Sequence, residues 1–65
     1  MSKSPIEVIR TALEREKDAV LEYGEFAKTA EEPAIRDMFL FLVEEEKKHV
    51  KMLQDEIEKE VYQEM

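Results

Sequence analysis

The sequence predicts an all-α fold: an antiparallel two-helix hairpin that self-associates into a four-helix bundle, as a dimer or a larger assembly. Apolar residues recur at alternating steps of three and four through both halves of the chain, which is the spacing of a helix-packing face. No segment alternates as a strand would, and we find no internal repeat or low-complexity stretch. At 65 residues, the chain forms one domain.

The first helix is predicted over residues 5–30. Ser4 suits the N-cap, Pro5 the first helical position, and Glu7 stands three residues after the cap. Gly24 lies inside this helix, either at a tolerated surface position or where a neighbouring helix approaches closely. The predicted seam residues are Ile6, Ile9, Leu13, Glu16, Val20, Tyr23, Ala27 and Ala30.

The second helix is predicted over residues 33–62, with Pro33 in its first turn. The connection, residues 30–32, is short enough to make the two helices antiparallel neighbours. The predicted seam residues are Ile35, Phe39, Leu42, Glu46, His49 and Leu53. Residues 39–43 are all apolar and wrap more than one helix face, so we expect a homodimer or a higher homo-oligomer.

Composition excludes several partners and sites. The net charge of −7 argues against nucleic acid and against an anionic membrane surface, and it favours cations. The absence of cysteine excludes disulfides and thiolate-ligated metal sites. No apolar stretch is long enough to span a membrane and no signal peptide is visible, so we expect a cytoplasmic protein.

Two carboxylates and one imidazole interrupt the apolar seams. Glu16 and Glu46 are equally distant from a turn centred near residue 31, so they should face each other. His49 follows Glu46 by three residues and shares its helix face. Because burying an unpaired carboxylate costs several kcal/mol, we expect a metal ion to hold these three side chains together.

One chain supplies too few donors for a metal that needs four to six. Two hairpins related by a two-fold axis would offer four glutamates and two histidines, and the four carboxylate charges would balance two divalent cations. The sequence therefore predicts a dimetal site shared between subunits. Carboxylate-rich ligation with an imidazole suits iron, although manganese or zinc would also bind.

The stretch of residues 12–19 with Tyr23, followed by Glu46 and His49, resembles one half of a rubrerythrin or ferritin-like helical domain over about residues 6–57. Such bundles carry one Glu on each of two helices and a Glu-x-x-His pair on each of the others. The resemblance implies that Glu16 is a terminal ligand, Glu46 a bridging carboxylate and His49 the imidazole ligand of a di-iron centre. The single-hairpin encapsulated ferritins are similar in forming this centre between subunits.

The chain departs from these relatives in two respects. It lacks the cysteine-rich rubredoxin-like centre of rubrerythrins, which removes a built-in electron donor. The resemblance also implies an encapsulin shell as partner and a place inside such a nanocompartment. However, the sequence stops at Met65 without a shell-targeting peptide, so we expect no shell association unless the protein continues beyond this residue.

We therefore expect a ferroxidase or di-iron oxidoreductase that converts Fe(II) to Fe(III) with O₂ or H₂O₂. Tyr23, two turns from Glu16 on the same face, is a candidate redox-active residue, but a seam aromatic more commonly serves packing. Manganese-dependent peroxide disproportionation remains a chemical variant. Two other interpretations stay open: passive metal storage or delivery, and a non-enzymatic interaction module in which the polar seam sets partner choice.

Overall fold

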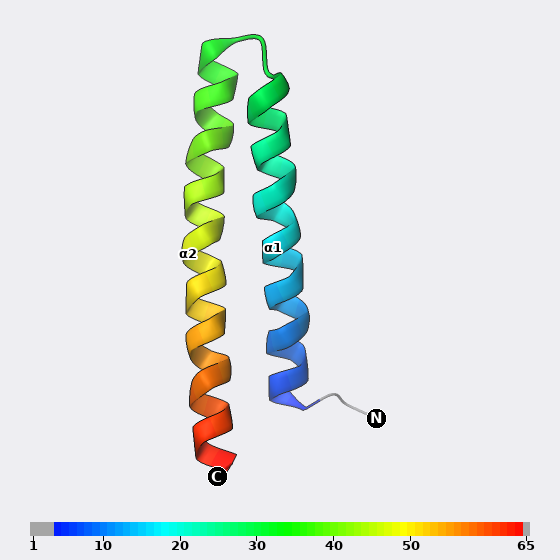
Figure 1. Cartoon of the computed structure of the whole chain (residues 1–65), viewed down its shortest axis with the longest axis vertical. Helices are drawn as coiled ribbons and strands as arrows, with labels where there is room; N and C mark the ends of the chain where they lie inside the picture. Colours follow the sequence, from blue (N-terminus) through cyan, green and yellow to red (C-terminus); the bar gives the residue numbers. More distant parts are fainter. Residues whose placement is uncertain (1–3, 65) are drawn as a thin grey trace.

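The computed structural model describes residues 4–64, with side chains described for residues 4–60. Helix α1 spans Pro5–Thr29 and helix α2 spans Pro33–Glu64. The helices run antiparallel along each other, joined by a short loop at one end, with both termini at the other end (Figure 1). The hairpin is flat, with extents of 49 × 24 × 11 Å. The predicted all-α class is confirmed.

Local chemistry accounts for the helix boundaries. The Ser4 side chain accepts a hydrogen bond from the Glu7 backbone N–H at 3.3 Å, as predicted for an N-cap. At the other end of α1 the Ala30 N–H bonds to the Phe26 carbonyl at 3.0 Å, and Ala30 itself is extended. Pro33 then opens α2, where its missing N–H costs no helical hydrogen bond.

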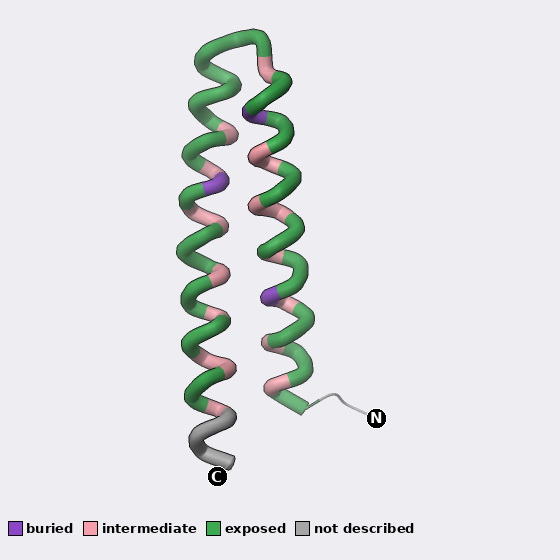
Figure 2. Tube along the Cα trace, viewed as in Figure 1, coloured by how far each residue is buried: buried purple, intermediate pink, exposed green. Residues whose placement is uncertain are grey.

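The core is a narrow seam between the helices. Leu13, Ala27 and Val43 are its buried apolar residues, at 8%, 4% and 9% exposure. Figure 2 shows the buried and half-buried positions on the inner edges of both helices. Near the loop the Phe39 ring packs against two α1 rings, with centroid distances of 6.1 Å to Tyr23 and 5.3 Å to Phe26.

The α2 stripe differs from the predicted one at two positions. The inward residues of α2 include Phe39, Val43, Glu46, Val50, Leu53 and Ile57. Ile35, predicted in the seam, is 41% exposed, because the buried and half-buried positions of α2 begin only at Phe39 and residues 33–38 are all exposed. His49 lies one position off the same stripe, at the edge of the seam.

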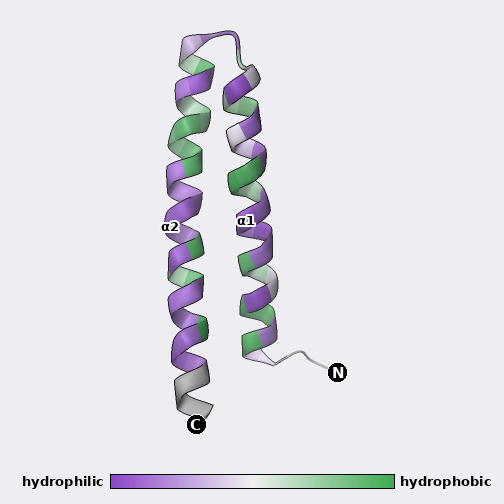
Figure 3. Ribbon diagram, in the orientation of Figure 1, coloured by the Kyte–Doolittle hydropathy of each residue, from purple (hydrophilic) through white to green (hydrophobic). Residues whose placement is uncertain are grey.

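Much apolar surface remains outside the seam. The most exposed large apolar side chains are Leu21 at 69%, Phe41 at 63% and Met52 at 58%. In the apolar run at residues 39–43, Val43 is buried while Leu40 and Phe41 point outward. Hydrophobic positions are spread along both helices in Figure 3. A single hairpin leaves this surface uncovered, which is the physical basis for expecting self-association.

The outer surface is polar. Lysine and glutamate residues three apart form exposed ion pairs along both helices, such as Lys28–Glu25 at 3.3 Å and Lys59–Glu56 at 3.1 Å. Exposed pairs of this kind add only tenths of a kcal/mol each, so the seam has to hold the hairpin together. Within the described part of the chain, neither helix has a stretch long and apolar enough to cross a membrane.

Candidate metal centre

The structure brings Glu16, Glu46 and His49 together midway along the hairpin. Glu16 projects from α1, and the other two residues project from successive turns of α2. One ligand atom from each side chain lies within 4.8 Å of the other two. The short loop fixes the register that sets both glutamates at one level, and the helical repeat adds the histidine from the next turn.

His49 lies between the two carboxylates. Its Nδ1 is 3.3 Å from Glu46 Oε2 and 3.5 Å from Glu16 Oε2. In the Nδ1–H tautomer the imidazole donates a hydrogen bond to Glu46. The side chain of Glu46 is 17% exposed, that of Glu16 30% and that of His49 47%. The imidazole is therefore the most solvent-exposed of the three side chains.

Glu16 carries an unsatisfied oxygen. Its Oε2 is shielded from solvent and has no hydrogen-bond partner, because the approach of His49 at 3.5 Å lacks hydrogen-bond geometry. A shielded carboxylate oxygen without a partner costs about 1–3 kcal/mol or more. A cation among the three side chains would remove that cost. The donor set, two carboxylates and an imidazole, therefore fits a divalent metal such as iron, manganese or zinc.

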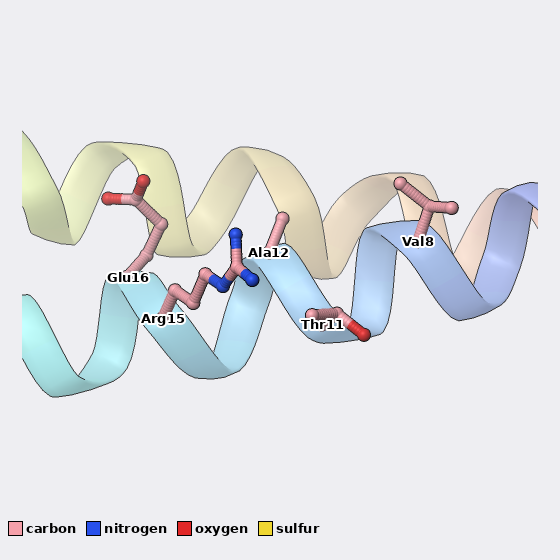
Figure 4. A pocket seen from close by; sticks show the side chains of 5 residues that line it. All are labelled: Val8, Thr11, Ala12, Arg15 and Glu16. Atoms are coloured by element: carbon pink, nitrogen blue, oxygen red, sulfur yellow. The ribbon is translucent and has the colours of Figure 1, made fainter.

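An open hollow of about 410 Å³ lies beside Glu16 on α1. It is lined by Val8, Thr11, Ala12, Arg15 and Glu16, and the Glu16 carboxylate extends from α1 toward α2 (Figure 4). Arg15 is not identified from the sequence pattern, because it lies outside the apolar seam. Its position directly before Glu16 is the signal that could have pointed to it. Its side chain lines the same hollow as Glu16.

Tyr23 lies outside this group. The tyrosine is half-buried in the seam, and its ring packs 6.1 Å from the Phe39 ring on the loop side of the carboxylates. Three ligating residues, Glu16, Glu46 and His49, form the candidate metal group without it. Packing accounts for the position of Tyr23, and its predicted redox role stays a prediction.

Comparison with known proteins agrees with this architecture. The model of the rubrerythrin family matches residues 7–65. An uncharacterized protein of Archaeoglobus fulgidus is 32% identical over 54 residues, which cover 83% of this chain and 84% of that protein. No solved structure matches. Rubrerythrins typically bind iron, and the Glu/His group provides a position at which a metal could bind. The chain belongs to the rubrerythrin family of the ferritin-like superfamily.

Proposed function

We propose that this protein is a di-iron carboxylate protein with ferroxidase-type activity, oxidising Fe(II) with O₂ or H₂O₂ at a site shared by two copies. The observation that carries the proposal is the shielded, unpartnered Oε2 of Glu16 beside Glu46 and His49. Nothing within the described part of the hairpin satisfies that oxygen, whereas a divalent cation would. The family to which the chain belongs favours iron as this cation.

A second copy is needed because three donors leave an iron ion under-coordinated. Exposed apolar residues lie on the same side of the hairpin as the group. Val8, 54% exposed, lines the hollow next to Glu16, and Met52, 58% exposed, lies one turn along from His49. Packing these surfaces against each other would bury apolar area and double the ligand set. The resulting four glutamates and two histidines match the ligand set of ferritin-like dimetal bundles.

Iron is the substrate of the proposed reaction. Two Fe(II) ions each give one electron to dioxygen, which takes up two protons and leaves as H₂O₂. With H₂O₂ as oxidant, the same two electrons and two protons split the O–O bond and release two waters. The four carboxylates favour Fe(III) over Fe(II) by charge, which supplies driving force. The half-buried setting of Glu16 and Glu46 strengthens this effect relative to water.

Alanine variants of the group test the proposal. Anaerobic titration of the wild type should saturate near about two Fe(II) per pair of chains, and oxygen should then produce an oxo-bridged ferric absorption. Glu46→Ala and His49→Ala should abolish both signals. Glu44→Ala is the matched control, because its carboxylate is two residues away, 68% exposed and paired with Lys47. Undiminished iron oxidation by Glu46→Ala would refute the site.

The role of Tyr23 is tested in the same assay. Tyr23→Phe keeps the ring that packs on Phe39 and removes only the hydroxyl. If the phenol is redox-active, the variant should bind Fe(II) as the wild type does and oxidise it more slowly. Equal oxidation rates would leave Tyr23 as a packing residue.

Two alternatives give different results. A passive metal-storage or delivery protein would bind Fe(II) without consuming oxygen. An interaction module would show the same thermal stability with and without Fe(II), because only a ligand that binds the folded state raises that stability. The observation that favours an interaction module is the exposure of Leu21 and Phe41, two large apolar side chains that a protein partner would cover.

A further inference from the structure

The two helices carry related segments at the level of the metal group, although the sequence was expected to hold no repeat. Residues 13–20 read Leu-Glu-Arg-Glu-Lys-Asp-Ala-Val, and residues 43–50 read Val-Glu-Glu-Glu-Lys-Lys-His-Val. At an offset of 30 residues, four of these eight positions are identical and the first is apolar in both segments. The match is confined to the part of each helix that carries a ligand glutamate.

Equivalent residues have equivalent environments. Leu13 and Val43 are both buried, at 8% and 9% exposure. Each segment has an ion pair between its first glutamate and its lysine, Glu14–Lys17 at 3.7 Å and Glu44–Lys47 at 3.5 Å. Because the helices are antiparallel, these equivalences define an approximate two-fold axis perpendicular to the flat hairpin.

A groove of about 310 Å³ lies on the side of the hairpin away from His49 and supports the same axis. Five residues line this groove. Four of them form two equivalent pairs, Lys17 with Lys47 and Val20 with Val50, and the fifth is Leu21. Lys47 and His49 are two residues apart and therefore about 200° apart around α2. The equivalence thus holds on this surface as well as in the buried seam.

The axis relates Glu16 to Glu46, and it relates His49 to Ala19. Each of these last two residues follows its glutamate by three positions, one turn along the helix. Glu46 has the His49 imidazole as its hydrogen-bond partner at 3.3 Å. Glu16, followed by Ala19, keeps the shielded Oε2 without a partner. The symmetry is therefore broken at the position where a second imidazole would stand.

We propose that Ala19 is a specificity-determining residue of the metal centre. Its methyl group limits each chain to three donors and leaves the Glu16 side open to a donor from outside the hairpin. A histidine there would give both helices a Glu-x-x-His pair, and one chain would then hold four donors. A four-donor set with two imidazoles favours closed sites for zinc or cobalt, whereas an open position is needed for reaction with an oxidant. This inference rests on the proposed metal binding at Glu16, Glu46 and His49.

Cobalt titration of Ala19→His tests the inference without using activity. Co(II) reports its ligands through its visible absorption and forms four-coordinate complexes readily. The variant should bind Co(II) roughly tenfold or more tightly than the wild type, with a more intense absorption band, because it adds a fourth donor. Ala19→Glu should act in the same direction with an oxygen donor. Circular dichroism without metal establishes that both variants fold.

Two controls separate an added ligand from other effects. Leu21→His adds an imidazole two residues further along α1, at a position that is 69% exposed and lines the groove on the side away from His49. Ala19→Leu adds bulk at position 19 without a donor. Neither should tighten Co(II) binding. Wild-type affinity and spectrum in both folded donor variants, or equal tightening by a control, would overturn the assignment of Ala19.

The outcomes also distinguish this inference from the proposed function. Wild-type protein that binds neither Co(II) nor Fe(II) would count against the metal centre itself. Co(II) binding by Ala19→His in that case would show an engineered site and would not support the assignment of Ala19. Wild-type binding that neither donor variant improves would leave the metal centre intact and refute the role of Ala19.

Discussion

Two regions of the hairpin seam have opposite character. Near the loop, Phe39 packs between Tyr23 and Phe26, and Ala27 is the most buried of the apolar core residues at 4% exposure. Midway along, the seam holds two carboxylates and an imidazole, and one oxygen there has no partner. The first region stabilises the hairpin by burying apolar surface. The second region opposes burial unless a cation is bound.

This difference indicates that separate parts of the seam serve folding and metal binding. The short loop fixes the antiparallel register that sets Glu16 level with Glu46, and aromatic packing beside the loop stabilises that register. The carboxylates gain nothing from facing each other without a metal, since like charges repel. We infer that the loop-side region forms the hairpin and that the polar level is held in place for binding.

The largest expected effect comes from removing the central ring of the loop-side region. Phe39→Ala should lower the free energy of unfolding by about 2–3 kcal/mol, because a large half-buried ring that packs on Tyr23 and Phe26 is lost from a small core. Urea denaturation followed by circular dichroism measures the change. Phe41→Ala is the matched control, since Phe41 is 63% exposed in the hairpin and should cost much less.

Protein concentration refines this test. If Phe41→Ala costs as much as Phe39→Ala, and the cost grows at higher protein concentration, Phe41 is buried in an assembly. An equal cost that is independent of concentration would contradict the core position assigned to Phe39.

A smaller and opposite effect is expected at the polar level. Glu46→Leu should raise the stability of the metal-free protein by about 1–2 kcal/mol, because an apolar side chain replaces a carboxylate that is 17% exposed. The variant should also lose any stabilisation by added Fe(II) or Co(II). Thermal melts with and without metal measure both changes. Glu44→Leu, at a 68% exposed carboxylate, should leave metal stabilisation intact. A destabilised metal-free Glu46→Leu would show that the carboxylate serves the fold.

The helix ends and the level of the two glutamates could be predicted from the sequence. The Ser4 cap and the Pro33 start follow from local chemistry, and both are observed. The meeting of Glu16 with Glu46 follows from a three-residue loop and the helical repeat. These features depend on near neighbours or on one short connection, which is why periodicity and capping rules suffice for them.

Other features depend on how the helices wind around each other. Ile35 lies outside the seam because burial on α2 begins only at Phe39, which the spacing of apolar residues does not show. A regular helix also drifts about 20° per heptad relative to a seven-residue pattern. The same drift places His49 at the seam edge with 47% of its side chain exposed. The unpartnered oxygen of Glu16 depends on side-chain geometry, which the sequence pattern does not specify.

The smallest expected effect concerns Gly24, which lies between Tyr23 and Phe26 in the loop-side part of α1. Gly24 is half-buried, yet a Cβ added there would meet nothing within 4 Å. Since alanine is favoured over glycine in a helix interior by about 1 kcal/mol, Gly24→Ala should stabilise the hairpin by up to that amount. Urea denaturation at two protein concentrations, with sedimentation to follow assembly, measures the outcome. A variant that is less stable, or that assembles less well, would show that a helix of a second copy packs closely on Gly24. The surface interpretation of this glycine would then be wrong, and the approach of the second copy would be located on that part of α1.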